Sequence, residues 1–222
     1  LIQELRRSDY DGTIIVGGYF ATFSSQEILQ DFPEIDFVVR GEGELTLVEL
    51  LNTLFHQREC SFKGIQGLSF RENGQIVENP SRPLINDLDI LPPVDRKYAN
   101  CVLNRGSRLR IYGTRGCWGR CTFCDIIKLY GCSPGRVWRY RTVTNLVDEI
   151  ESLVKHFSTD YFVFNDDQFI IKGVKGWQRA EEFASELERR KLNIQFELMC
   201  RADTIHRATL NRRTSGHYIP RP

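Results

Sequence analysis

The chain has 222 residues, of which 41% are hydrophobic, and its formal net charge is +1 at pH 7. This composition is typical of a globular protein with one large or two small domains, and no apolar run approaches the roughly 18 residues of a membrane span. The seven cysteines are odd in number and mostly scattered, and the sequence begins with no predicted signal peptide. These features exclude a secreted disulfide scaffold and favour a reducing, cytoplasmic location.

The first half of the chain alternates predicted strands and helices. The opening LIQELRRSDYDG resembles the last turns of a helix, so we expect a fragment of a longer protein. Thr13–Gly18 and Ile35–Glu44 each predict a strand that runs into a glycine-bearing loop. Ser24 and Glu27 have capping-box spacing, which predicts a short helix. A second helix is indicated by the apolar positions Leu47, Val48, Leu50, Leu51, Leu54 and Phe55. This order favours a parallel sheet covered by helices.

The middle of the chain changes character. The stretch GLSFRENGQIVEN predicts a hairpin that turns at Asn73 and Gly74, the pair favoured in a type I′ turn. Pro80–Asp95 is rich in proline and has no clear period, which indicates a linker between domains.

The second half alternates again. Leu109–Thr114, Tyr161–Asp166 and Ile194–Leu198 are predicted strands. Two helices are predicted between these strands. The first has Thr142 or Thr144 as its N-cap, and its apolar face consists of Leu146, Val147, Ile150, Leu153, Val154 and Phe157. The apolar face of the second consists of Trp177, Ala180, Phe183, Ala184 and Leu187. The order β-α-β-α-β corresponds to the first three units of a (β/α) barrel. We therefore predict an α/β protein with an irregular tail at 206–222.

Three cysteines lie close together after the first of these strands. Cys117, Cys121 and Cys124 have the spacing C-x3-C-x2-C, and thiolates suit iron–sulfur clusters, copper(I) or zinc. Structural zinc generally takes four ligands, and Cys132 is the nearby fourth candidate. Three ligands on a four-iron cluster leave one iron without a protein ligand, which is typical of a catalytic metal centre. The region from Cys101 to Arg141 is basic, because Asp125 is its only acidic residue. This positive charge indicates either a site that binds an anion or a solvated basic loop.

The cysteine triplet and the aromatic residue in CTFC resemble the radical S-adenosylmethionine enzymes. The segments IIVGGYFAT and EIDFVVRGEGELTLVELL, with LINDLDILPPVDR and VWRYRTVTNLVDEIESLVKHF, resemble the class with a cobalamin-binding domain before the barrel, in the same order over most of residues 10–205. The resemblance implies a partial Rossmann-like cobalamin-binding domain over 1–60, a hairpin and linker over 61–104, and a partial radical S-adenosylmethionine barrel over 105–222.

The same resemblance implies the cofactors and their ligands. Cys117, Cys121 and Cys124 would hold a [4Fe–4S] cluster whose unique iron chelates S-adenosylmethionine, and one electron would then cleave the sulfonium to a 5′-deoxyadenosyl radical. Phe123 would lie beside the adenine and, with Trp118, would exclude water. Arg115 and Arg120 would balance charge around the cluster.

Other candidate site residues follow the later strands. Asp166 or Asp167 would receive the methionine amino group, although the chain departs here from the Gly-Gly-Glu pattern of many relatives, and a turn or helix cap is the alternative. Arg201 would pair with the methionine carboxylate, with a solvated arginine as the alternative. Glu197, if it faces the barrel interior, needs a partner.

Four glycines end the predicted strands of the first half. Gly17, Gly18, Gly41 and Gly43 would let the backbone approach the corrinoid, or they simply turn the chain.

The leading hypothesis is a cobalamin-dependent radical enzyme that acts on a small-molecule substrate by methyl transfer or rearrangement, with a reductant of flavodoxin or ferredoxin type. We expect neither a membrane nor a nucleic acid as partner. The alternatives are a radical S-adenosylmethionine enzyme without cobalamin, a metal-stabilised binding module with Cys132 as fourth ligand, and an inactive fragment.

Overall fold

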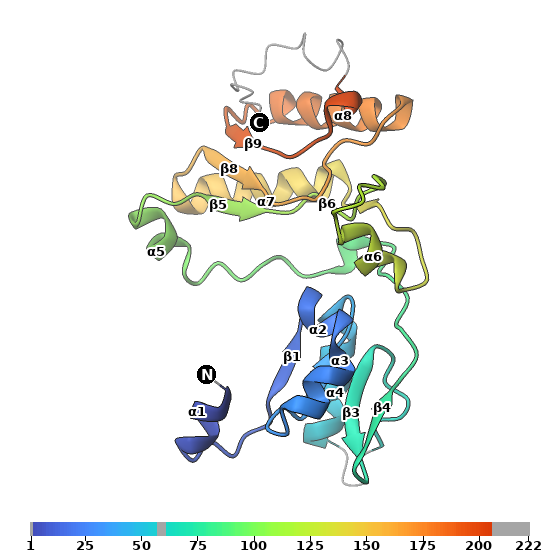
Figure 1. The fold of residues 1–222 in the computed structure, drawn as a ribbon. Coiled ribbons are helices and arrows are strands. Elements are labelled where there is room, and N and C mark those ends of the chain that lie inside the picture. Colours follow the sequence, from blue (N-terminus) through green and yellow to red (C-terminus); the bar gives the residue numbers. More distant parts are fainter. Residues whose placement is uncertain (1, 57–60, 206–222) are drawn as a thin grey trace. The chain divides into compact units, whose positions relative to one another are not determined.

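The computed structural model describes residues 2–56 and 61–205, which form two compact units (Figure 1). The first unit extends to Ile85 and also includes Cys121–Arg136. The second contains Asn86–Arg120 and the chain from Val137 onward. The described helices include none with the length and apolar character that crossing a membrane would require.

A four-stranded sheet organises the first unit, in the order β1-β2-β3-β4. The strands are β1 (Ile15–Gly17), β2 (Phe37–Val39), β3 (Leu68–Glu72) and β4 (Gln75–Glu78). β1 and β2 are parallel as predicted, and β3 and β4 form the predicted hairpin. Asn73 and Gly74 both have positive φ, 49° and 77°, as a type I′ turn requires. Because β3 pairs antiparallel with β2, the hairpin extends this sheet and is more than a connecting element.

Helices cover both faces of the first sheet. The helices of this unit are α1 (Ile2–Arg7), α2 (Tyr19–Phe23), α3 (Ser25–Asp31), α4 (Gly43–His56) and α6 (Ile126–Gly131). Leu50 of α4 is fully buried in the same cluster as Phe37 and Phe70, while Leu29 of α3 lies in a second cluster with Val38. Since Phe37 and Val38 are consecutive in β2, these clusters lie on opposite faces of the sheet.

The second unit contains a three-stranded parallel sheet in the order β5-β8-β9. Its strands are β5 (Leu109–Ile111), β8 (Tyr161–Phe164) and β9 (Gln195–Glu197), connected by the helices α7 (Val143–Phe157) and α8 (Val174–Arg189). This confirms the predicted order β-α-β-α-β. A short antiparallel pair, β6 (Thr114–Arg115) with β7 (Arg139–Tyr140), lies between β5 and α7 in sequence. The remaining elements are α5 (Ala99–Asn104), η1 (Leu88–Ile90) and η2 (Ala202–Thr204).

The helix α7 shows why the second unit folds as its sequence predicts. Leu146, Val147 and Ile150 are fully buried on one face of α7, and each such side chain contributes about 1.5–3 kcal/mol. They join Phe162 and Phe164 of β8 in the core. Thr142 caps the helix, because its side chain accepts a hydrogen bond from the Asn145 N–H at 3.3 Å.

Some local predictions fail. Ser24 precedes α3 as expected, but its side chain makes no capping hydrogen bond. The loop expected after β1 is occupied by the short helix α2, which begins directly after Gly18. The mixed α/β class with parallel strands is confirmed, whereas the domain boundaries at 60 and 104 stay predictions. The tail over 206–222 lies outside the described residues.

Candidate functional site

The root of the cysteine loop lies at the carboxyl end of β5. The backbone turns at Gly113, enters β6, and reaches Gly116, where φ is 83°. A Cβ atom at Gly113 would lie 2.8 Å from Cε2 of Phe169, a separation that real side chains do not adopt. Glycine is therefore required at Gly113 by close packing and favoured at Gly116 by backbone conformation.

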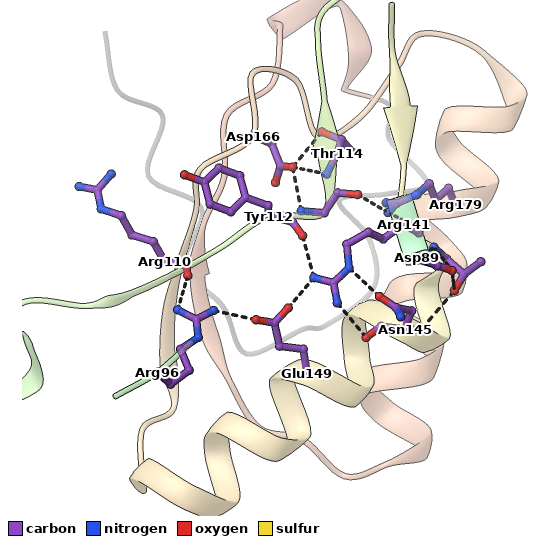
Figure 2. A network of polar contacts seen from close by, with 12 residues as sticks. Asp89, Arg96, Arg110, Tyr112, Thr114, Arg141, Asn145, Glu149, Asp166 and Arg179 are labelled. Atoms are coloured by element: carbon purple, nitrogen blue, oxygen red, sulfur yellow. Dashed lines mark hydrogen bonds and ion pairs between the residues drawn. The ribbon is translucent and has the colours of Figure 1, made fainter. Parts of the chain in front are cut away.

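Asp166, which follows β8, fixes this root by its side chain (Figure 2). Its Oδ1 accepts hydrogen bonds from the Gly113 N–H at 2.8 Å, from the Thr114 N–H, and from the Thr114 hydroxyl at 2.9 Å. Asp166 is 2% exposed, and its Oδ2 has no hydrogen-bond partner among the described residues. The carboxylate thus joins the end of β8 to the strand that leads into the cysteines.

Burial changes the acid–base properties around Asp166. It raises the pKa of Asp166 from 3.8 to about 6, although the hydrogen bonds from Thr114 and Gly113 oppose the shift. Burial also lowers the pKa of Arg179, whose charge is partly compensated by Asp166. The Arg179 guanidinium donates to the carbonyl oxygens of Gly113 and Arg141 at 3.3 and 3.0 Å, so it supports the same turn from α8.

The two residues after Asp166 continue this connection. Asp167 accepts a hydrogen bond from the Gly116 N–H at 3.0 Å, one residue before Cys117. The Gln168 carbonyl oxygen accepts from the Thr114 hydroxyl at 3.1 Å, and the Gln168 side chain accepts from the Arg201 N–H at 3.1 Å. The segment after β8 therefore contacts both the cysteine loop and the segment after β9.

A charged network supports the other side of this region (Figure 2). Glu149 of α7 pairs with Arg96 at 2.7 Å and also with Arg141. Arg141 donates to the Tyr112 carbonyl oxygen at 3.0 Å, while Arg96 donates to that of Arg110 at 2.9 Å. Glu149 consequently holds two arginines that bind the backbone of β5 and of the turn after it.

Arg201 follows β9 and lies against the cysteine loop. Its Cζ is 4.9 Å from the centre of the Trp118 ring, and its Nε donates to Oδ1 of Asp203 at 3.0 Å. A Cβ atom at Gly119 would lie 3.2 Å from Nη1 of Arg201 and 3.3 Å from Sγ of Cys117. The structure thus brings together two predicted site residues, Arg201 and Cys117, around Gly119.

The three cysteines are partly exposed, and none of them forms a disulfide bond with another described residue. Sγ of Cys117 accepts a hydrogen bond from the Gly119 N–H at 3.3 Å and belongs to the second unit, whereas Cys121 and Cys124 belong to the first. Across residues 2–56 and 61–205, no group of three or more His, Cys, Asp or Glu side chains is close enough together to hold a metal ion. As a donor set, three accessible thiols fit an iron–sulfur cluster, and their joint coordination stays a prediction from their spacing.

Other predicted site residues differ in their surroundings. Phe123 is 89% exposed and Arg120 is also exposed, so the roles expected of both stay predictions. Arg115 is partly buried in β6. Glu197 in β9 has the partner that we expected it to need, because the Tyr161 hydroxyl donates to it at 2.7 Å.

The four glycines lie at the carboxyl ends of β1 and β2. Gly18 and Gly41 have φ of 93° and 71°, in the region that favours glycine, whereas Gly17 lies within β1 and Gly43 begins α4. A Cβ atom at Gly17 would lie 3.1 Å from the Val39 carbonyl oxygen. The glycines thus have conformational and packing roles that exist without any ligand.

Thr22 of α2 joins the two glycine loops. Its Oγ1 accepts from the Gly41 N–H at 2.9 Å, and its hydroxyl is 2.8 Å from the Gly18 carbonyl oxygen, to which it donates. Thr22 was not predicted, because a loop was expected where α2 forms. Arg179 was not predicted either, although this arginine lies on the stripe formed by the buried positions Gly176, Phe183 and Leu187 of α8.

Comparisons with known proteins connect this site to a family. No protein-family model matches the chain. It is 32% identical over 200 residues to an uncharacterized methyltransferase of Pyrococcus horikoshii. This alignment covers 87% of this chain and 40% of the methyltransferase. It is 29% identical over 213 residues to the anaerobic magnesium-protoporphyrin IX monomethyl ester cyclase of Rubrivivax gelatinosus, which covers 93% of this chain and 37% of the cyclase. The chain therefore spans about 40% of the length of these relatives.

A solved structure gives the same result in three dimensions. The cobalamin-dependent S-adenosylmethionine radical enzyme OxsB, with aqua-cobalamin and S-adenosylmethionine bound, superposes with a TM-score of 0.73 and 26% identity. The match covers 92% of this chain and 28% of OxsB. The family predicted from the cysteine triplet and from the segments on either side of it is confirmed: this chain belongs to the cobalamin-dependent radical S-adenosylmethionine enzymes.

Proposed function

We propose that this chain forms the part of a cobalamin-dependent radical enzyme that binds a [4Fe–4S] cluster, S-adenosylmethionine and one side of cobalamin. The observation that carries the proposal is the position of the C-x3-C-x2-C loop. It follows the first strand of a parallel sheet, and Arg201, from the end of the third strand, lies beside Cys117. Ligands of parallel α/β sheets bind at the carboxyl ends of the strands.

In this proposal Cys117, Cys121 and Cys124 would be the three protein ligands of the cluster, and the amino and carboxylate groups of S-adenosylmethionine would bind where no protein ligand does. When bound, the cluster supplies one electron that breaks a carbon–sulfur bond of S-adenosylmethionine, giving methionine and a 5′-deoxyadenosyl radical. A reductant of flavodoxin or ferredoxin type provides that electron. The three cysteines are partly exposed, so they are accessible for cluster assembly.

The chain's own charged groups then orient the methionine part. Arg201 offers a planar guanidinium to the carboxylate, a pairing that is often bidentate. Asp166 is occupied by the Gly113 and Thr114 donors, which supports a role in shaping the loop. Asp167 accepts a hydrogen bond from the Gly116 N–H, and Gly116 is the residue directly before Cys117. Asp167 is therefore a better candidate than Asp166 for the methionine amino group.

We further assign the first unit to cobalamin. Its parallel strands β1 and β2 end in the glycine loops that Thr22 connects, and backbone with positive φ at Gly18 and Gly41 allows close approach of a flat ligand. In this assignment the first unit is a portion of a Rossmann-like domain and the second is the beginning of a (β/α) barrel. Methyl transfer and radical rearrangement on a small molecule are both reactions that this cofactor set supports.

Anaerobic reconstitution of the chain with iron and sulfide tests the cluster. We expect about four irons per chain and the absorption and electron paramagnetic resonance spectra of a [4Fe–4S] cluster. Cys117→Ala should lose most of the iron, whereas Cys101→Ala, an exposed thiol on α5, is the matched control and should retain it. Dithionite and S-adenosylmethionine should then yield methionine and 5′-deoxyadenosine. A chain that binds only zinc would refute the proposal.

Cys132 distinguishes this proposal from a metal-stabilised binding module. It is an exposed thiol directly after α6. If it were a fourth ligand, Cys132→Ala would lose metal as Cys117→Ala does. The proposed open iron predicts instead that Cys132→Ala keeps its cluster and still changes its spectrum when S-adenosylmethionine is added. Titration of the chain with aquacobalamin, followed by absorbance, separates the cobalamin-dependent reading from one in which the first unit is only a scaffold.

A further inference from the structure

We propose that Trp118 is a positioning residue for Arg201: its ring holds the guanidinium beside the cysteine loop, where Arg201 binds the carboxylate of S-adenosylmethionine. This inference rests on the proposed function and adds a residue that the cysteine motif does not specify. Trp118 acts through Arg201 and needs no contact of its own with the reacting atoms.

The geometry of the contact carries the proposal. The Arg201 Cζ lies over the Trp118 ring, 4.9 Å from its centre, within the distance at which a guanidinium is attracted to an aromatic face. Tryptophan is the most favourable aromatic residue for this interaction. Trp118 directly follows Cys117, so the residue that carries the ring is the neighbour of the first predicted cluster ligand.

The rest of Arg201 is also fixed. Its backbone N–H donates to the side-chain oxygen of Gln168 at 3.1 Å, and its backbone carbonyl oxygen accepts from the hydroxyl of the buried Thr204 at 2.6 Å. Asp203 accepts from Nε at 3.0 Å, which holds one edge of the guanidinium, while Trp118 covers its face. Because backbone, edge and face are each held, the side chain loses little further freedom when it binds a carboxylate.

Gly119 supplies the space for this approach. A Cβ atom there would lie 3.2 Å from Nη1 of Arg201 and 3.3 Å from Sγ of Cys117. The residue after Trp118 thus leaves the guanidinium next to the thiol, where the amino-acid end of S-adenosylmethionine would be chelated. The indole Nε1 of Trp118 is buried and has no hydrogen-bond partner among the described residues, so the ring is not held in place by its N–H.

The test measures binding of S-adenosylmethionine to the anaerobically reconstituted chain by equilibrium dialysis, with values normalised to cluster content. Trp118→Leu should weaken binding by about three- to tenfold, the effect of losing one cation–π contact. Trp118→Phe keeps an aromatic face and should retain most of the affinity. Tyr98→Leu, an exposed aromatic residue beside α5, is the matched control and should bind as the unaltered chain does.

A double-mutant cycle separates positioning from a general structural role. Arg201→Leu should weaken binding more than Trp118→Leu, and adding Trp118→Leu to Arg201→Leu should cause less than a twofold further loss. Unaltered affinity in Trp118→Leu, or losses that multiply in the double variant, would overturn the inference while leaving the proposed function intact. If the unaltered chain assembles no cluster, the proposed function fails and this inference fails with it.

Discussion

The buried carboxyl of Asp166 predicts an unusual dependence of stability on pH. Burial raises the pKa of Asp166 to about 6 in the folded chain, against an ordinary value of 3.8. Between these values the folded chain binds the proton more tightly than the unfolded chain, so the free energy of unfolding falls as pH rises. One pKa unit corresponds to about 1.4 kcal/mol, so the full shift corresponds to about 3 kcal/mol, most of it lost between pH 4 and 6.

The assay compares the cluster-free chain with Asp166→Asn by urea unfolding at several pH values between 4 and 7. Asparagine cannot titrate, so the unaltered chain minus the variant isolates the contribution of Asp166. This difference should decrease by about 2–3 kcal/mol from pH 4 to pH 7. Subtraction removes the opposite contributions of acids such as Glu186, whose pKa is lowered to about 2, mainly by its hydrogen bond with Arg189.

Thr114 provides an internal check. Its hydroxyl donates to Asp166 at 2.9 Å and so lowers the pKa of the buried carboxyl. Thr114→Val should therefore raise that pKa further and extend the loss of stability to higher pH, whereas Thr114→Ser keeps the hydroxyl and should leave the pH range of the loss unchanged. A difference between the unaltered chain and Asp166→Asn that stays constant from pH 4 to 7 would refute the argument.

The remaining predictions concern the supports of the two loops. Glu149→Gln should lower the free energy of unfolding by about 1–3 kcal/mol in urea titrations, because it leaves two largely buried arginines without their shared carboxylate. Thr22→Val should cost about 1–3 kcal/mol by the same assay, since it removes both hydrogen bonds between the glycine loops, and Thr22→Ser should restore them. Gly119→Ala should change the midpoint of thermal unfolding little but weaken S-adenosylmethionine binding in dialysis several-fold, because its Cβ displaces Arg201.

The sequence was most informative where periodicity and local chemistry agree. The stripe of α7 and the alternation of strands with helices in the second unit are correct, because apolar spacing alone determines which face of a helix is buried. Asn73 and Gly74 mark the hairpin turn for the same local reason. Capping is less certain: both Thr142 and Thr144 have the right chemistry, and the backbone at the start of α7 selects Thr142.

Long-range contacts were beyond the sequence. Nothing local indicates that the hairpin pairs with β2, since register between distant strands depends on packing. Asp166 was predicted to be a cofactor ligand or a turn residue, yet its carboxylate binds a backbone segment more than 50 residues earlier. Arg179 was not predicted, because its neighbour Ala180 was assigned to the buried face of this helix. A charged residue on a buried stripe is a usable signal, because burial of a charge requires partners.

The contacts of the cysteine loop explain how a short motif gains a defined position. Asp166 accepts a hydrogen bond from Thr114, Asp167 accepts one from Gly116, and the Arg201 guanidinium lies over the Trp118 ring. The start of the cysteine loop is thus contacted at three positions by the segments that follow β8 and β9. Parallel strands direct their carboxyl ends to one edge, and three such ends therefore supply the loop and its supports together. The C-x3-C-x2-C spacing sets which thiols are available, while the order of the strands sets which side chains reach the first of them.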